Sequence, residues 1–185
     1  MQLPRRLDTE RLVLRPFMEE DNAPFLAFMM DPIATRYLVF PDEMRTRPGA
    51  QALFDTVMGS YEGEAPIFSL AITERNGRFV GSCGLSPLGS DNGTWECYYS
   101  LLREFWGRGY ASEATKALLE WAFQTSSIRE IRAYMSPENP NSAGVAERIG
   151  MVDLGLQPHP VFGNEGRVFA MTRPNSQHPH PARTT

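Results

Sequence analysis

Strand-like periodicity gives way to helical periodicity across one stretch of this sequence, Phe105-Trp106-Gly107-Arg108-Gly109-Tyr110-Ala111-Ser112-Glu113. A strand is expected to end near Leu102, and two glycines follow before apolar residues recur at helical spacing. Glycines let a backbone approach a bulky anion, and the free N–H groups of a first helical turn point at it. These residues alone leave an anion-binding loop and a tight structural turn equally open. A Walker A loop is excluded because Tyr110-Ala111 stands where Lys-Ser/Thr is needed.

Before this stretch, the pattern predicts one strand, two helices and an antiparallel meander of three strands. The helices are recognised by apolar stripes and the strands by alternation. Asn76-Gly77 is a strong hairpin turn signal, and Ser90–Gly93 forms the next turn. The expected strands cover 12–17, 67–72, 79–85 and 94–101, and the expected helices cover 18–31 and 49–61.

After it, two helices and three strands are expected: helices 113–123 and 142–149, and strands 128–135, 151–156 and 168–172. Gly150 is a natural residue to end the second of these helices. The order βααβββαβαββ predicts a mixed α+β protein with about seven strands and four helices. We expect one domain over residues 1–173 and a flexible tail over 174–185, which is rich in proline.

Composition indicates an ordinary globular protein rather than a disordered or fibrous one. The 185 residues are 42% hydrophobic and carry a formal net charge of −4. No apolar stretch approaches the roughly 20 residues of a membrane-spanning helix, and the N-terminus lacks the apolar region of a signal peptide. A cytoplasmic protein that does not bind a membrane is therefore expected.

Arginine dominates the basic residues, since Lys116 is the one lysine among the 18. Arginine suits phosphate recognition, so nucleic-acid binding was one interpretation of the bias. The acidic net charge and the absence of a basic run favour codon bias in a GC-rich genome instead. No nucleic-acid partner is expected.

Histidine and cysteine placement indicates neither a metal site nor a covalent thiol mechanism. His159, His178 and His180 lie in proline-rich segments and show no ligand spacing. Cys83 and Cys97 lie on neighbouring expected strands and are expected to be buried free thiols, with no histidine near them in sequence.

Three ordered motifs resemble one known family. Trp106-x-x-Gly109-x-Ala111 resembles the Gln/Arg-x-x-Gly-x-Gly/Ala loop that binds the acetyl-CoA pyrophosphate in the GCN5-related N-acetyltransferases, and Trp106 departs from its first position. Two more motifs are similar to the branch of the ribosomal-protein acetyltransferases RimJ and RimL. These motifs are Leu7-x-Thr9-Glu10-Arg11-Leu12-x-Leu14-Arg15-Pro16-Phe17 and Asn139-x-x-Ser142-x-x-Val145-x-Glu147-Arg148-Ile149-Gly150-Met151. Gly144 stands where that branch often has arginine, and Met151 where it usually has phenylalanine.

This resemblance, which covers Leu7 to Arg173, implies a bacterial acetyltransferase that takes acetyl-CoA as donor and uses no metal. Its fold would be a twisted, mostly antiparallel sheet with a V-shaped splay between the fourth and fifth strands, 94–101 and 128–135. The pantetheine arm would enter the gap and pair with the backbone around Leu101 and Leu102. The implied pyrophosphate site comprises Trp106, Gly107, Arg108, Gly109, Tyr110, Ala111 and Ser112. Asn139 would form hydrogen bonds with the pantetheine amides. The alternative is that Asn139 is only a turn residue.

Acetyl transfer to an amine needs a base, because the attacking amine must be neutral. Glu96 lies on the splaying strand, and burial among Trp95, Tyr98 and Tyr99 would raise its pKa to a useful value. The competing interpretation is a solvated strand glutamate.

Ser142 matches the serine that the branch places near the thiol sulfur, yet it also stands where a helix N-cap would. Tyr110 and Tyr134 are alternative acids, and Tyr134 is equally well placed as a core residue.

The expected reaction is direct attack by a primary amine in a ternary complex, with a protein N-terminal amine of alanine type or a small molecule as acceptor. Aromatic residues that could form the acceptor surface are Tyr37, Phe40, Phe68, Trp95 and Phe162. The rival hypothesis is a non-catalytic CoA-binding or regulatory module in which Glu96 and Ser142 are bystanders. A monomer or a homodimer is expected.

Overall fold

One mixed sheet of eight strands forms the centre of the molecule, in the order β1-β2-β3-β4-β5-β6-β8-β7. The computed structural model describes residues 2–88 and 93–174. Residues 175–185 of the expected tail and residues 90–92 of the expected turn lie outside them. The strands are β1 Leu7–Asp8, β2 Leu12–Arg15, β3 Ser69–Glu74, β4 Phe79–Pro87, β5 Thr94–Leu101, β6 Glu130–Met135, β7 Val152–Pro158 and β8 Glu165–Thr172.

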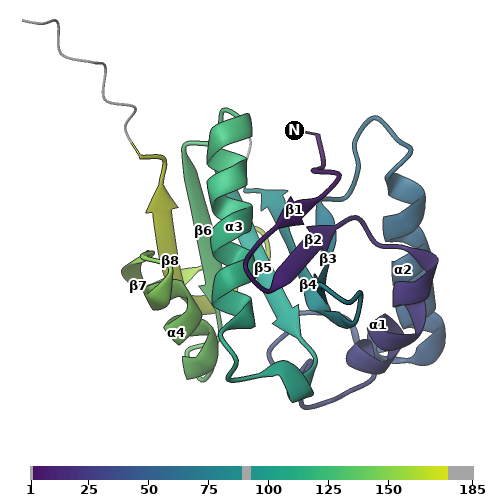
Figure 1. The fold of residues 1–185 in the computed structure, drawn as a ribbon. Coiled ribbons are helices and arrows are strands. Elements are labelled where there is room, and N and C mark those ends of the chain that lie inside the picture. Colours follow the sequence, from purple (N-terminus) through teal and green to yellow (C-terminus); the bar gives the residue numbers. More distant parts are fainter. Residues whose placement is uncertain (1, 89–92, 175–185) are drawn as a thin grey trace, which may run out of the picture.

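Within the described residues, four α-helices cover the two faces of the sheet (Figure 1). They are α1 Asn22–Met29, α2 Arg47–Ser60, α3 Tyr110–Thr125 and α4 Pro140–Arg148, with short 3₁₀ turns at Glu19–Asp21, Asp42–Arg45 and Arg103–Phe105. Strand alternation assigns the two cores. Leu70 and Ile72 of β3 pack with α3 and α4, whereas Ala71 between them packs with α1 and α2.

The mixed α+β fold predicted from the sequence is confirmed, with one more strand than the seven expected. The additional strand, β1, is two residues long and pairs Leu7 with Leu14 of β2. Two residues are too few to leave an alternating pattern. Helix α2 begins at Arg47 rather than Gly49, because the Thr46 side chain caps it by accepting the Gly49 N–H at 3.3 Å.

Strands β5 and β6 form the parallel pair that opens the sheet. Their pairing with each other covers Thr94–Glu96 and Glu130–Arg132. Beyond it, β5 continues to Leu101 beside β4 and β6 continues to Met135 beside β8. This is the V-shaped splay expected between the same two segments. It lies between the fifth and sixth strands once β1 is counted.

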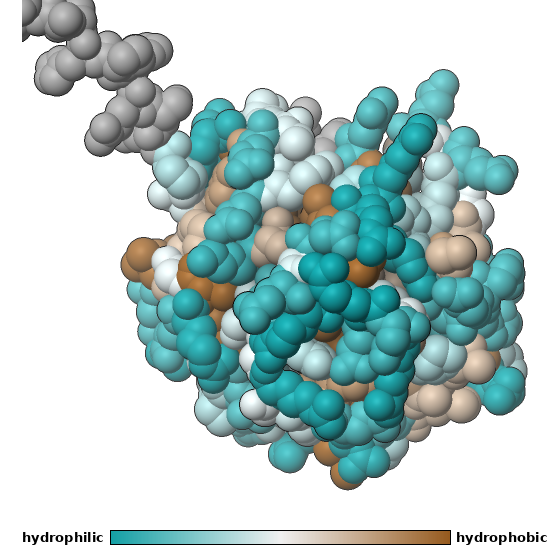
Figure 2. All heavy atoms as spheres, in the orientation of Figure 1, coloured by the Kyte–Doolittle hydropathy of each residue, from teal (hydrophilic) through white to brown (hydrophobic). Residues whose placement is uncertain are grey.

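Strand β7 forms one edge of the sheet and carries exposed apolar side chains, Val152, Leu154 and Leu156. Figure 2 shows apolar surface at the margin of the molecule where β7 lies, beside a largely hydrophilic face. No helix in residues 2–88 and 93–174 is long and apolar enough to cross a membrane.

Both cysteines lie inside the sheet core as free thiols, as expected. Cys83 of β4 and Cys97 of β5 are 0% and 3% exposed. Burial raises the pKa of the Cys97 thiol to about 12 and also raises the pKa of Cys83, because a thiolate would lose its solvation there.

We expect a disulfide reagent such as DTNB to label neither thiol of the folded protein at pH 8. A pKa near 12 leaves about a thousand-fold less thiolate than an ordinary cysteine has at that pH. In guanidinium chloride both thiols should react at once, which serves as the control. Rapid labelling of the folded protein would contradict the buried placement of these residues.

Candidate active site

A cavity of about 620 Å³ opens where β5 and β6 diverge. Its walls come from the segment after α1, from β5 and β6, from the loop before α3 and the first turn of that helix, and from one side of α4. The volume lies in the range of small-molecule sites. Ten of the twelve residues predicted from sequence line it: Glu96, Leu101, Trp106, Gly107, Gly109, Tyr110, Ala111, Ser112, Asn139 and Ser142. Leu102 and Arg108 do not.

The glycine loop before α3 has the backbone shape of an anion site. Gly107 and Gly109 have φ of 74° and 78°, a conformation that residues with a Cβ rarely adopt. Gly109 is the N-cap of α3, and its carbonyl accepts the N–H of Glu113. The N–H groups of the first helical turn have no acceptor within the helix. They belong to Tyr110, Ala111 and Ser112, which line the cavity. The stretch is therefore a tight turn that opens a helix onto a cavity, and anion binding by this loop stays a prediction.

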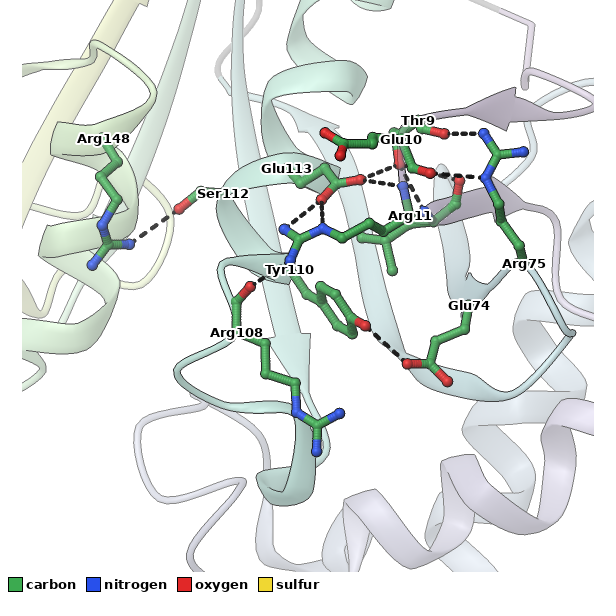
Figure 3. Close-up of polar contacts among 11 residues, drawn as sticks. Thr9, Glu10, Arg11, Glu74, Arg75, Arg108, Tyr110, Ser112, Glu113 and Arg148 are labelled. Carbon is green, nitrogen blue, oxygen red and sulfur yellow. Dashed lines mark hydrogen bonds and ion pairs between the residues drawn. The ribbon is translucent and has the colours of Figure 1, made fainter.

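Arg148 of α4 is the arginine that borders this loop inside the cavity. Its Nη1 donates to Ser112 Oγ at 3.1 Å (Figure 3). A Cβ on Gly144 would lie 3.3 Å from Arg148 Nη2, so the glycine leaves room for this guanidinium. Sequence reasoning did not select Arg148, although Gly144 one turn earlier was a visible departure from the family pattern.

Arg108, which sequence reasoning assigned to phosphate, lies outside the cavity lining. Its guanidinium carbon is 5.3 Å from the centroid of the Phe105 ring. Figure 3 shows the Arg108 side chain pointing away from Ser112 and Arg148.

The end of β5 presents Leu101, and not Leu102, to the gap. The Leu102 N–H donates to the carbonyl of Val80 in β4, so by strand alternation the backbone of Leu101 faces the opposite side. The Leu101 carbonyl accepts the indole N–H of Trp106 at 2.9 Å. Trp106, the residue that departs from the family motif, is thereby held against the last carbonyl of the strand.

Glu96 lies at the vertex of the splay, where the β5–β6 pairing ends. Its Oε2 is 3.1 Å from Nε2 of His159, a residue 6% exposed. Nδ1 of His159 accepts the backbone N–H groups of Val161 and Phe162 at 3.1 and 3.2 Å. These two bonds assign the ring proton to Nε2, so the imidazole donates to the Glu96 carboxylate.

Burial raises the pKa of Glu96, and the hydrogen bond from His159 opposes this rise without cancelling it. The side chain is 20% exposed, so the interpretation of Glu96 as a solvated strand glutamate is wrong. Sequence reasoning missed His159 because it lies 63 residues away in the β7–β8 connection. Its position between two prolines, Pro158 and Pro160, gave no signal of the partner.

Asn139 and Ser142 are joined at the start of α4. Asn139 is the N-cap, since its Oδ1 accepts the Ser142 N–H at 3.2 Å, so the alternative of Ser142 as cap is wrong. Asn139 Nδ2 also donates to Ser142 Oγ at 3.1 Å. The serine hydroxyl thus accepts one bond and keeps its own hydrogen for a further acceptor. Tyr99 donates to the Ser142 carbonyl at 2.8 Å and so ties α4 to β5.

The two candidate tyrosine acids are placed differently. Tyr110 donates its hydroxyl hydrogen to Glu74 Oε1 at 2.9 Å (Figure 3). Tyr134 is half-buried, lines the cavity, and packs edge-on against the His159 ring with centroids 4.6 Å apart. Tyr134 is therefore a wall of the site rather than a core residue.

Tyr37 lines the cavity, whereas the other four aromatic residues considered for the acceptor surface do not. Its hydroxyl donates to the Glu138 carbonyl at 2.8 Å, which joins the segment after α1 to the loop before α4. Within the part of the chain that the structure describes, no three histidine, cysteine or acidic side chains gather as a metal site would require.

The chain is similar to known acetyltransferases. A family model described as an acetyltransferase (GNAT) domain matches residues 11–152. The uncharacterized N-acetyltransferase p20 of Bacillus licheniformis is 33% identical over 153 residues, which cover 81% of this chain and 84% of that protein.

Solved structures are similar over almost the whole chain. The acetyltransferase of Agrobacterium tumefaciens strain C58 is 30% identical with a TM-score of 0.73, over 92% of this chain and 95% of that one. RimL, a ribosomal L7/L12 alpha-N-protein acetyltransferase in complex with coenzyme A, has a TM-score of 0.73 at 16% identity. The similarity covers 92% of this chain and 97% of RimL. At that identity the second likeness concerns the fold alone.

Proposed function

The chain belongs to the GNAT acetyltransferase domain family, and from this premise we propose that it transfers the acetyl group of acetyl-CoA to a primary amine. One observation carries the proposal: a single cavity is lined both by the glycine loop before α3 and by Glu96, whose carboxylate pairs with His159. Glu96 and Leu101 are five residues apart on β5, about 16 Å in an extended strand. Leu101 lies beside the glycine loop, where its carbonyl accepts the Trp106 indole N–H, so this length separates the loop from Glu96. An elongated donor with phosphates at the loop and a thioester near Glu96 fits it.

The donor would bind along the gap between β5 and β6. Its diphosphate would accept the N–H groups of Tyr110, Ala111 and Ser112, with Arg148 beside them as a cation. The pantetheine amides would pair with the backbone of Leu101 and with Asn139. The coenzyme A bound to RimL, which shares this fold, supports the choice of ligand.

The reaction would begin with a proton passing from the acceptor ammonium to the Glu96 carboxylate, which frees the nitrogen lone pair. That lone pair attacks the thioester carbonyl in the ternary complex. The C–N bond forms, the C–S bond breaks, and the remaining extra proton of the nitrogen passes to the departing thiolate. Coenzyme A leaves as a thiolate and takes up a proton, with the Ser142 hydroxyl as hydrogen-bond donor to the sulfur.

The acceptor would approach from the side bordered by residues 33–38, where Tyr37 links two loops over the cavity. A protein N-terminus of alanine type and a small-molecule amine both present the group that this reaction requires. Their shared chemistry, a primary amine with its lone pair freed by Glu96, defines the substrate class of this proposal.

Acetyl-CoA at about 100 times its Kd should stabilise the folded protein by about 2.7 kcal/mol, which corresponds to a rise in Tm of about 5–10 °C. Release of free CoA should follow when a panel of amines and alanine-ended peptides is added, and acetate in place of acetyl-CoA is the control. Absence of a Tm shift would overturn the proposal. A shift with no CoA release on any amine would instead favour the non-catalytic CoA-binding module.

Glu96→Gln should lower kcat by about 10²- to 10⁴-fold, because glutamine cannot take the proton. Only the carboxylate form of Glu96 acts as base, and burial raises its pKa, so the wild-type rate should rise with pH above the usual range of a glutamate. That ascending limb should flatten in the variant. Glu104→Gln, which changes an exposed glutamate, is the matched control. An unchanged profile in Glu96→Gln would place the base elsewhere.

Arg148→Gln should raise KM for acetyl-CoA by about ten-fold with little change in kcat, since one charge-assisted contact to phosphate is lost. Arg108→Gln should change KM much less because its side chain lies outside the cavity lining. The reverse ranking, measured by steady-state kinetics, would return the phosphate contact to Arg108.

A further inference from the structure

Glu113 lies in the first turn of α3, directly after the glycine loop and Tyr110–Ser112. It accepts hydrogen bonds from the N-terminal segment (Figure 3). Its Oε1 accepts the Thr9 hydroxyl at 2.6 Å and the Arg11 N–H at 2.8 Å. Its Oε2 accepts Arg11 Nε at 2.7 Å and Nη2 at 2.6 Å. Burial alone would raise the pKa of Glu113, but these hydrogen bonds hold it below its usual value, so the carboxylate is ionised.

The same guanidinium also touches the glycine loop itself. Arg11 Nη1 donates to the carbonyl of Arg108 at 2.9 Å, and the guanidinium carbon lies 4.8 Å from the centroid of the Tyr110 ring. A Cβ on Gly109 would lie 3.4 Å from Arg11 Nη2. The Arg11 side chain therefore contacts three consecutive residues of the loop: Arg108, Gly109 and Tyr110.

Charge gives Arg11 a second effect on the loop. Glu113 follows Ser112 in the chain, so a full negative charge stands close to the N–H groups that would donate to a diphosphate. An unpaired carboxylate there would repel an anionic ligand, and the bidentate pair with Arg11 neutralises it.

We propose that Arg11, assisted by Thr9, is a positioning residue for the donor: it holds the Gly107–Ser112 loop in its anion-binding shape and neutralises Glu113. The inference rests on the proposed function, because the donor is acetyl-CoA. It assigns a task to the Thr9-Glu10-Arg11 motif, which lies outside the lining of the cavity.

Arg75 is a matched control within the same structure. Its Nε donates to the Glu10 carbonyl at 2.9 Å and its Nη2 to the Thr9 carbonyl, so it fastens the same segment. Figure 3 shows Arg75 on the other side of that segment, bonded to neither Glu113 nor the loop. If fastening the segment were all that mattered, Arg75 and Arg11 would be equally important for donor binding.

The test measures acetyl-CoA affinity by calorimetry, together with kcat and KM, for the wild type, Arg11→Gln, Glu113→Gln, the double variant and Arg75→Gln. Arg11→Gln should raise Kd and KM by ten-fold or more, and kcat should change by less than about three-fold, because the chemistry at Glu96 is untouched. Added salt should reduce the loss, since it screens the unpaired Glu113. The double variant should regain part of the affinity, and Arg75→Gln should bind like the wild type.

Wild-type affinity in Arg11→Gln would overturn the inference, and so would an equal loss in Arg75→Gln or a double variant no better than Arg11→Gln. Failure of the wild type to bind acetyl-CoA would overturn the proposed function instead, so the two failures are distinguishable. If Arg11→Gln does not fold, Arg11→Lys takes its place. It keeps the charge but cannot hold Glu113 and the Arg108 carbonyl together, so an intermediate loss of affinity is expected, and wild-type affinity would again overturn the inference.

Discussion

The parallel pairing of β5 with β6 covers Thr94–Glu96 and Glu130–Arg132, and the site depends on where it ends. Beyond that point each strand turns one backbone edge toward a gap, and buried N–H and C=O groups need partners. Trp106 takes the Leu101 carbonyl at the open end. Helices α3 and α4 both begin at this gap, and the N–H groups in the first turn of α3 border the cavity.

Glu96 lies at the closed end of the same gap, and its environment works against its charge. Burial disfavours the carboxylate, and the Nε2–H of His159 offsets only part of that cost. Burial of the Glu96 carboxylate lowers the stability of the fold and raises the proton affinity of that carboxylate. Functional sites commonly show this exchange of stability for reactivity. The loop between β7 and β8 supplies the compensation, through the bonds that Val161 and Phe162 donate to His159.

The differences between the predicted site residues and the residues that line the cavity have physical causes. Leu102 was expected beside Leu101, but strand alternation turns its backbone toward β4. Arg108 stands between two glycines of positive φ, and the direction of its side chain depends on that backbone path. Arg148 and His159 were missed because their partners, Ser112 and Glu96, are 36 and 63 residues away.

The sequence by itself determined the order of the elements from β2 onward, the glycine loop that opens α3 and the position of Glu96 on the splaying strand. These features are local, because side-chain periodicity and glycine conformation act over a few residues. Tertiary structure alone decided that His159 meets Glu96, that Arg148 borders the loop and that Arg11 neutralises Glu113. Each of these pairs joins segments that are far apart in the sequence and are brought together by sheet register and helix packing. No local pattern in the chain encodes a contact between such segments.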